Sequence, residues 1–250
     1  MKGLPNDLQR NGYQGCQLGS SCDCIGLSVQ GELLPIHAWL GGSMITAIEQ
    51  GTDAWKQQRL GYVTASRVTD VMAKVKTGEA KTREKYRYEL VVQRLTGVVP
   101  ESYTNDAMAW GTDNEPYARM KYEARTGNFV QLTGFHKHPT IAWVGASPDG
   151  LVEEDGLIEI KCPNTDTHLR TLEANKAPSQ YIAQMQMQMW VMNRDWCDFV
   201  SYDPRLPEEL CYFTVRVLRD DEYIKNMESE VLAFLAEIET TITTLKERKC

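Results

Sequence analysis

Hydrophobic and polar positions follow two periods along the chain, and these periods predict its helices and strands. Helical patterns occupy residues 53–59, 82–95, 114–125, 178–192 and 220–247. Shorter runs rich in β-branched and aromatic residues predict strands at residues 129–132, 135–138, 141–144, 157–160, 199–202 and 210–217. A further helix is expected from about Thr64, with Thr64 or Ser66 as its N-cap. Strands interleaved with helices predict an α/β fold, in which helices flank a central mixed β-sheet.

The apolar stripes of the longer helices predict which side chains are buried. Residues 82–95 place on their inner face Tyr86, Leu90, Val91 and Leu95. Residues 220–247 turn inward Val231, Leu235, Ile238, Ile242 and Leu245. Residues 178–192 carry two stripes. One is apolar and indicates core packing, with Met185, Met189 and Met192. The other is polar at i, i+4 spacing, with Gln180, Gln184 and Gln188.

The strand expected near residue 159 is apolar but carries two charges. Because strand side chains alternate between faces, Glu159 and Lys161 point the same way, while the isoleucines beside them face a core. Pro, Asp and Gly at residues 148–150 form a turn signal, so Asp149 is delivered to this strand from a neighbouring turn. Burying charged side chains is energetically costly, so two charges on an otherwise buried strand indicate a specific role for them.

Two carboxylates beside a lysine are suited to metal-assisted hydrolysis of a phosphodiester. Mg²⁺ prefers oxygen ligands and keeps several waters, so Asp149, Glu159 and a substrate phosphate would supply a typical protein site. Lys161 would orient the attacking water or stabilise the charge of the transition state. The competing interpretation is structural: Asp149 is a turn residue, and Glu159 and Lys161 are a surface pair on an edge strand.

Composition narrows the class of protein. The 250 residues, 42% of them hydrophobic, suffice for one large domain or two small ones. No run of apolar residues is long enough to span a membrane, and the N-terminus lacks a secretory pattern, so we expect a cytoplasmic protein. Seven scattered cysteines indicate free thiols, and the group at Cys16, Cys22 and Cys24 lacks a fourth ligand for a metal.

Charge gives a mixed picture of DNA binding. The net charge of −7 argues against tight contact with nucleic acid over the whole surface, although carboxylates of an active site contribute to that number. One basic cluster surrounds Gly78, and it consists of Lys74, Lys76, Lys81, Arg83, Lys85 and Arg87. As a loop between helices this cluster could touch a phosphate backbone, and it could equally be a solvated face.

The motifs around Asp149 resemble a known family. Residues 147–150, Ser-Pro-Asp-Gly, followed by residues 159–163, Glu-Ile-Lys-Cys-Pro, resemble the PD-(D/E)XK nuclease core. More specifically, they resemble bacteriophage lambda exonuclease and its YqaJ-type viral recombinase relatives. Further blocks match in the family's order, at residues 51–55, 59–66, 109–111 with Glu115, 181–186, 189–190 and 202–205.

This resemblance implies a restriction-endonuclease-like core and an activity. Members digest one strand of linear double-stranded DNA in the 5′-to-3′ direction with Mg²⁺, release mononucleotides and leave a 3′ overhang for recombination by single-strand annealing. It also implies two metal ions, which Mn²⁺ can replace, a toroidal homotrimer that threads DNA, and a single-strand annealing recombinase as partner. The alternatives are a PD-(D/E)XK endonuclease or RecB-like nuclease, and a non-catalytic DNA-binding scaffold.

The resemblance also assigns roles to single residues. It implies that Asp149, Glu159 and the backbone carbonyl of Ile160 bind metal. It implies that Lys161 and Glu115 position the attacking water, supported by Gln184. A 5′-phosphate pocket would contain Arg59, Ser66 and Ser147. The family's second phosphate arginine falls on Thr167, with His168 and Arg170 nearby.

The N-terminal segment differs from the rest of the chain. Residues 1–43 are rich in Gly, Ser, Asn and Gln and show no sustained period, so we expect little regular structure there. The resemblance begins after Met44, which predicts a single nuclease domain at residues 44–250. Residues 1–43 are then either a genuine extension or the product of a misassigned start codon.

Overall fold

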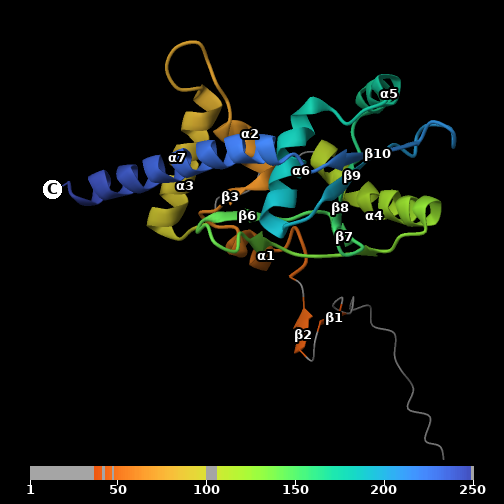
Figure 1. Cartoon of the computed structure of the whole chain (residues 1–250), viewed down its shortest axis with the longest axis horizontal. Coiled ribbons are helices and arrows are strands. Elements are labelled where there is room, and N and C mark those ends of the chain that lie inside the picture. Colours follow the sequence, from red (N-terminus) through yellow and green to blue (C-terminus); the bar gives the residue numbers. More distant parts are fainter. Residues whose placement is uncertain (1–36, 41–42, 47, 100–105, 249–250) are drawn as a thin grey trace, which may run out of the picture. The chain divides into compact units, whose positions relative to one another are not determined.

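Two mixed β-sheets and their covering helices organise the part of the chain that the computed structural model describes, residues 37–40, 43–46, 48–99 and 106–248 (Figure 1). The helices are α1 (Asp53–Gln58), α2 (Val68–Val71), α3 (Lys81–Thr96), α4 (Asp106–Thr126), α5 (Thr165–Ala174), α6 (Ser179–Met192) and α7 (Asp221–Lys246), with a 3-10 turn η1 (Ala65–Arg67). The predicted α/β class is confirmed.

The larger sheet has five strands in the order β10-β9-β8-β7-β4. Its strands are β4 (Val130–Gln131), β7 (Gly150–Val152), β8 (Gly156–Lys161), β9 (Trp196–Tyr202) and β10 (Tyr212–Leu218). Only β8 and β9 run parallel in this sheet, and the other neighbours are antiparallel. The central strand β8 therefore has a partner on each edge.

The second sheet has the order β3-β6-β5, and its strands are β3 (Val63–Thr64), β5 (His136–Lys137) and β6 (Val144–Ala146). A separate antiparallel pair consists of β1 (His37–Leu40) and β2 (Ser43–Thr46). Strand β1 falls at the end of the segment expected to be irregular. Residues 1–36, including the three N-terminal cysteines, lie outside the described residues, so the division into extension and domain stays a prediction. Cys162, Cys197 and Cys211 are free thiols, as expected.

Strand β8 is buried on both faces because a helix covers each of them. Leu157 packs with Met185 and Met189 of α6 on one face. Ile158 belongs to the cluster on the other face, which contains Tyr122 of α4. The methionine stripe of α6 thus packs in the core as predicted. The charges of β8 consequently lie on a central strand that has a helix on each face. This position excludes the interpretation of Glu159 and Lys161 as a surface pair on an edge strand.

Helices α3 and α7 pack against each other and share a second core with α6. The predicted inner faces are confirmed except at their last positions, Leu95 and Leu245, which are 42% and 40% exposed. Both residues lie in the final turn of their helices.

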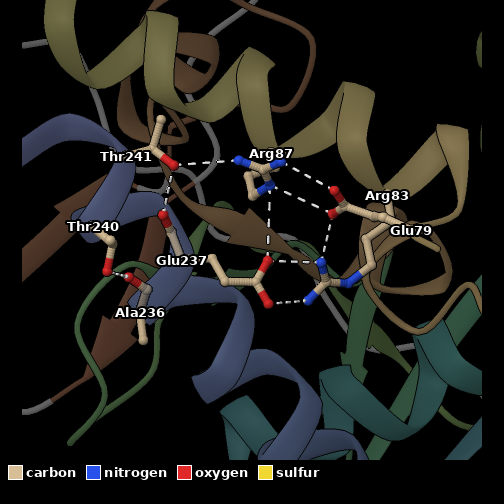
Figure 2. A network of polar contacts seen from close by, with 7 residues as sticks. All are labelled: Glu79, Arg83, Arg87, Ala236, Glu237, Thr240 and Thr241. Atoms are coloured by element: carbon tan, nitrogen blue, oxygen red, sulfur yellow. Dashed lines mark hydrogen bonds and ion pairs between the residues drawn. The ribbon is translucent and has the colours of Figure 1, made fainter. Parts of the chain in front are cut away.

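A network of ion pairs joins α3 to α7 (Figure 2). Arg83 contacts both oxygens of Glu237 at 2.7 and 2.9 Å and Glu79 at 2.6 Å. Arg87 donates to Glu79 at 3.0 Å and to the hydroxyl of Thr241 at 3.2 Å. Two arginines of the basic cluster are therefore paired with carboxylates of the protein itself. The interpretation of the whole cluster as a phosphate-binding loop is wrong for these two.

Two predicted elements differ from the structure around the chemical motif. The strand expected at residues 141–144 begins only at Val144, because Trp143 has a positive φ of 64° that ends extended backbone before it. The turn signal at residues 148–150 leads directly into β7, where Gly150 pairs with Ile158. A Cβ at Gly150 would lie 2.2 Å from the side chain of Val130, so close packing rather than turn geometry requires this glycine.

Three helical predictions also change. Helix α4 starts at Asp106 rather than Asn114, so Pro116 lies in its interior. The proline removes the helical donor of the Thr112 carbonyl, and the helix tolerates this loss because both residues are exposed and that carbonyl can reach water. The helix expected from Thr64 is the 3-10 turn η1 followed by the single turn α2, and Thr64 makes no side-chain cap hydrogen bond. Helix α5 was not predicted.

Candidate active site

The buried carboxylate of Glu159 is the centre of the candidate site. Its side chain is fully buried in the middle of β8. Oxygen Oε1 accepts hydrogen bonds from the Lys161 ammonium and, at 2.5 Å, from the Gln184 amide. Oxygen Oε2 accepts from the amide of Gln188 at 2.6 Å. The contact with Lys161 confirms that residues 159 and 161 share one face of the strand.

Asp149 lies against the same strand, immediately before β7. Its Oδ2 accepts a hydrogen bond of 2.6 Å from the backbone N–H of Ile160, which separates Glu159 from Lys161 in the sequence. Desolvation and the neighbouring Glu159 carboxylate raise the pKa of Asp149 well above its usual value. The turn therefore delivers this carboxylate to β8, as the sequence predicts.

Glu115 reaches the site from α4, which packs on β8. It is half-buried, and desolvation raises its pKa, with Arg119 and Lys161 acting against that rise and Glu159 adding to it. Burial alone would lower the pKa of Lys161, but Glu159 and Asp149 outweigh it and the net shift is upward. The lysine is thus firmly cationic, and three carboxylates share it.

The donor set fits a hard divalent cation. Across the described ranges, no three His, Cys, Asp or Glu side chains converge as a ready-made metal centre. Mg²⁺ needs fewer protein ligands than that, because it retains waters and takes oxygens from a substrate phosphate. Desolvation, with a smaller contribution from neighbouring carboxylates, raises the pKa values of Asp149 and Glu115, and a bound cation would favour their charged forms. Asp149 and Glu159 are the carboxylates placed to hold it.

A second group of predicted residues meets around Trp55, on α1. Arg59, at the end of α1, donates to Ser66 Oγ at 3.1 Å, and its guanidinium lies 3.9 Å from the centre of the Trp55 ring. The indole N–H of Trp55 donates to Ser147 Oγ at 3.1 Å. Arg59, Ser66 and Ser147 therefore belong to one connected cluster, although their elements are far apart in the sequence.

Arg59 carries a positive charge in an unusual setting. Burial lowers the pKa of Arg59 to about 10, and Tyr86 opposes that shift. No ion pair between Arg59 and a carboxylate occurs among the described residues. A desolvated guanidinium flanked by hydroxyls and an aromatic ring is suited to an anion such as a terminal phosphate.

His168 cannot take the place of the family's second phosphate arginine. Its ring is fully buried, with Nδ1 2.7 Å from Ser201 Oγ and Nε2 2.8 Å from the Leu210 carbonyl. Both ring nitrogens are occupied in anchoring α5 to the sheet. Arg170 is exposed, and its role stays a prediction.

Two residues were missing from the predicted site. Trp55 bridges the two halves of the arginine and serine cluster, and only its place in a matching sequence block distinguished it. Gln188 binds Glu159, and the signal for it was present, since it follows Gln184 by four residues on the polar stripe of α6. Gln180, one turn before them, is exposed.

The chain matches the model of the YqaJ-like viral recombinase domain over residues 54–195, more than half of its length. It belongs to this family. The matched residues include every predicted site residue, from Arg59 to Gln184. No helix in the described part of this family member has the length and apolarity needed to cross a membrane.

Solved structures agree with the family. The chain is similar to the alkaline exonuclease LHK-Exo of Laribacter hongkongensis, with 53% identity, a TM-score of 0.73 and coverage of 78% of this chain and 96% of that one. A crystal structure of LHK-Exo in complex with dAMP gives a TM-score of 0.74 with the same identity and coverage. A phage-related exonuclease of Haemophilus somnus shares the fold, at 17% identity and a TM-score of 0.58, covering 74% of this chain and 96% of that one. The fold is of the PD-(D/E)XK nuclease type.

A viral relative is more distant. The uncharacterized protein R354 of Acanthamoeba polyphaga mimivirus is 24% identical over 172 residues, which are 63% of this chain. The chain spans about 30% of the length of that protein.

Proposed function

We propose that this YqaJ family member is a divalent-metal-dependent exonuclease that digests one strand of linear double-stranded DNA from its 5′ end. One observation carries the proposal: the Asp149 side chain, which precedes β7, bonds the buried strand β8 next to Glu159 and Lys161. The similarity to an alkaline exonuclease, of which one structure holds a nucleoside monophosphate, supports the reaction class and a mononucleotide product.

The residues of the chain divide the chemistry among them. A bound Mg²⁺ or Mn²⁺, in one or two copies, would supply a water of lowered pKa and neutralise charge on the scissile phosphate. Asp149 and Glu159, with the Ile160 carbonyl, would hold it. Lys161 contributes a fixed positive charge beside the phosphate, which stabilises the extra negative charge of the transition state.

Glu115 and Gln184 complete the arrangement. Because burial raises the pKa of Glu115, this carboxylate is a better proton acceptor for the attacking water than an exposed glutamate would be. Gln184 donates to Glu159 Oε1 and so restricts the rotation of that carboxylate. Each group therefore has a separate task, and loss of one cannot be replaced by another.

Direction along the DNA would follow from the cluster around Trp55. Arg59, Ser66 and Ser147 offer one cation and two hydroxyls to a terminal 5′-phosphate, and no described carboxylate forms an ion pair with Arg59. Binding of that phosphate would set the first internucleotide bond at the metal site, so that cleavage releases one nucleotide and leaves a 3′ overhang. The overhang would serve a single-strand annealing recombinase, and the working assembly would be a toroidal homotrimer enclosing DNA.

A digestion experiment tests this proposal. Linear duplexes that carry a 5′-phosphate or a 5′-hydroxyl on a labelled strand would be incubated with Mg²⁺ or EDTA, beside a covalently closed circle. The Lys161→Ala variant would be compared with Lys176→Ala, which removes an exposed lysine. We expect metal-dependent release of mononucleotides from phosphorylated ends, lost only in Lys161→Ala. Cleavage of the circle would instead identify an endonuclease, and binding without hydrolysis would identify a scaffold.

A further inference from the structure

Gln188 is a buried amide on α6 that lies between two methionines in the sequence. Its side chain is fully buried, and its neighbours in the sequence, Met187 and Met189, are fully buried as well. The amide nitrogen donates to Glu159 Oε2 at 2.6 Å. The other carboxylate oxygen takes its hydrogen bonds from Gln184 and Lys161. The two glutamines therefore hold different oxygens of the same carboxylate.

The amide of Gln188 is only half satisfied. Its oxygen Oε1 is buried and has no hydrogen-bond partner in the described part of the chain. A flipped amide would not remove this defect, because the oxygen would then face the carboxylate of Glu159. An unpaired buried carbonyl destabilises a fold, and a methionine would avoid it. The contact with Glu159 is therefore what this position gains from a glutamine.

Gln186 provides a comparison two residues earlier on the same helix. It is 2% exposed, and both of its polar atoms are bonded to the backbone. Its nitrogen donates to the Leu218 carbonyl at 2.8 Å, and its oxygen accepts from the Asp220 N–H at 2.9 Å. Gln186 thus ties α6 to the start of α7, which is a structural role. The side chain of Gln188 has no hydrogen bond to a backbone group of the described residues.

We propose that Gln188 is a positioning residue for Glu159 and increases the affinity of the site for a divalent cation. By holding Oε2, while Gln184 and Lys161 bond Oε1, its amide fixes the rotation of the carboxylate and so the orientation in which Glu159 would meet the cation. Groups that orient a metal ligand commonly change metal affinity about 10- to 100-fold. The inference rests on the proposed function, since it requires Glu159 to be a metal ligand.

Direct metal binding is the main test. Calorimetric titration of the DNA-free protein with Mn²⁺ would compare the wild type with Gln188→Met, Gln186→Met and Glu159→Gln. Methionine is close in size to glutamine and suits both sites. We expect Gln188→Met to weaken Mn²⁺ binding about tenfold or more. Gln186→Met should lower the melting temperature and leave the Mn²⁺ affinity unchanged, because it touches no residue of the site.

Kinetics separates positioning from catalysis. In the DNA digestion assay, Gln188→Met should need a correspondingly higher Mg²⁺ concentration for half-maximal rate, while the rate at saturating Mg²⁺ stays within about threefold of wild type. Gln188→Leu is a second variant with the same expectation. Circular dichroism would establish that both unfold cooperatively.

The outcomes distinguish the inference from the proposed function. If Glu159→Gln abolishes Mn²⁺ binding while Gln188→Met and Gln188→Leu bind it like wild type, the inference is wrong and the metal site stands. If Glu159→Gln binds Mn²⁺ normally, the metal site itself is wrong. If neither Gln188 variant folds, the residue is structural, and the inference fails for that reason.

Discussion

Two clusters of charged side chains differ in how their cations and carboxylates are balanced. In the α3 and α7 network, two glutamates face two arginines, and hydrogen bonds from Arg87 chiefly lower the pKa of Glu79 (Figure 2). At the candidate site, three carboxylates share the cation of Lys161, and desolvation raises the pKa of Asp149. The balanced cluster joins two helices. The unbalanced one is poorly satisfied by the protein alone, which is what a site for a cation requires.

The largest contrast should appear in catalysis. Lys161→Ala removes the cation of the unbalanced cluster and should reduce the exonuclease rate roughly 10³-fold, because the fixed positive charge that the protein places beside the scissile phosphate is lost. Arg83→Met removes a cation of the balanced cluster and should leave the rate unchanged at a temperature where the variant is folded. Single-turnover digestion of a labelled duplex measures both. An equal loss of digestion rate in the two variants would show that the two clusters do not differ in their role in catalysis.

End recognition should change by a smaller factor. Arg59→Ala removes the guanidinium beside Ser66 and should reduce the preference for 5′-phosphorylated over 5′-hydroxyl ends by roughly 10- to 100-fold, the contribution of a charge-assisted contact. Lys56→Ala, on the same helix, removes a lysine whose partner is the exposed Asp53 and should leave the preference intact. The ratio of the two digestion rates is the measurement. A preserved preference in Arg59→Ala would place end recognition elsewhere.

Stability should respond with opposite signs. Asp149→Asn removes one of the repelling carboxylates and should stabilise the metal-free protein by about 1–2 kcal/mol. Arg83→Met breaks the network on both of its glutamates and should destabilise by about 1–2 kcal/mol. Urea unfolding in EDTA would measure both changes. Destabilisation by Asp149→Asn would show that this carboxylate is structurally satisfied without metal.

The smallest effect is a pH dependence that belongs to the network. Because the pKa of Glu79 is lower in the folded protein than its ordinary 4.5, the folded state holds the proton less tightly than the unfolded state. The stabilising contribution is therefore present above pH 4.5 and lost as the pH falls through the folded pKa. The melting temperature of Glu79→Gln should therefore change less with pH over this range than that of the wild type. An unchanged slope would exclude Glu79 as a contributor.

The sequence predicted the elements whose signal is local. Strand β8 was recognisable because Glu159 and Lys161 interrupt an apolar alternation, and α6 because its methionine and glutamine stripes keep helical spacing. Strand β7 was missed because Pro-Asp-Gly is also a turn signal. Helix α4 was predicted too short because a proline is tolerated in the first turn of a helix but not usually in its interior, which favours a start close to Pro116. Whether an interior proline is tolerated depends on exposure that the sequence does not state.

The rest depended on contacts between distant residues. Trp55 donates to a serine 92 residues away, and Arg83 binds Glu237, 154 residues away. The local sequence pattern does not distinguish such an arginine from one on a solvated loop. The sequence alone therefore left two interpretations of the basic cluster, and the ion pairs of Arg83 and Arg87 decide between them for these two residues. The family motifs predicted the residues of the candidate site, and the packing of α6 on β8 shows that Gln188 reaches Glu159.

The double coverage of β8 has a consequence for hydrogen exchange. Its backbone amides have strands on both edges and helices on both faces, so they should exchange with deuterium only when the whole domain unfolds. Arg59 and Ser66 instead lie at the end of the six-residue α1 and in the three-residue η1. Such short elements open locally, and their amides should exchange faster. Deuterium uptake would therefore report global stability at Glu159 and Lys161 and local opening at Arg59 and Ser66.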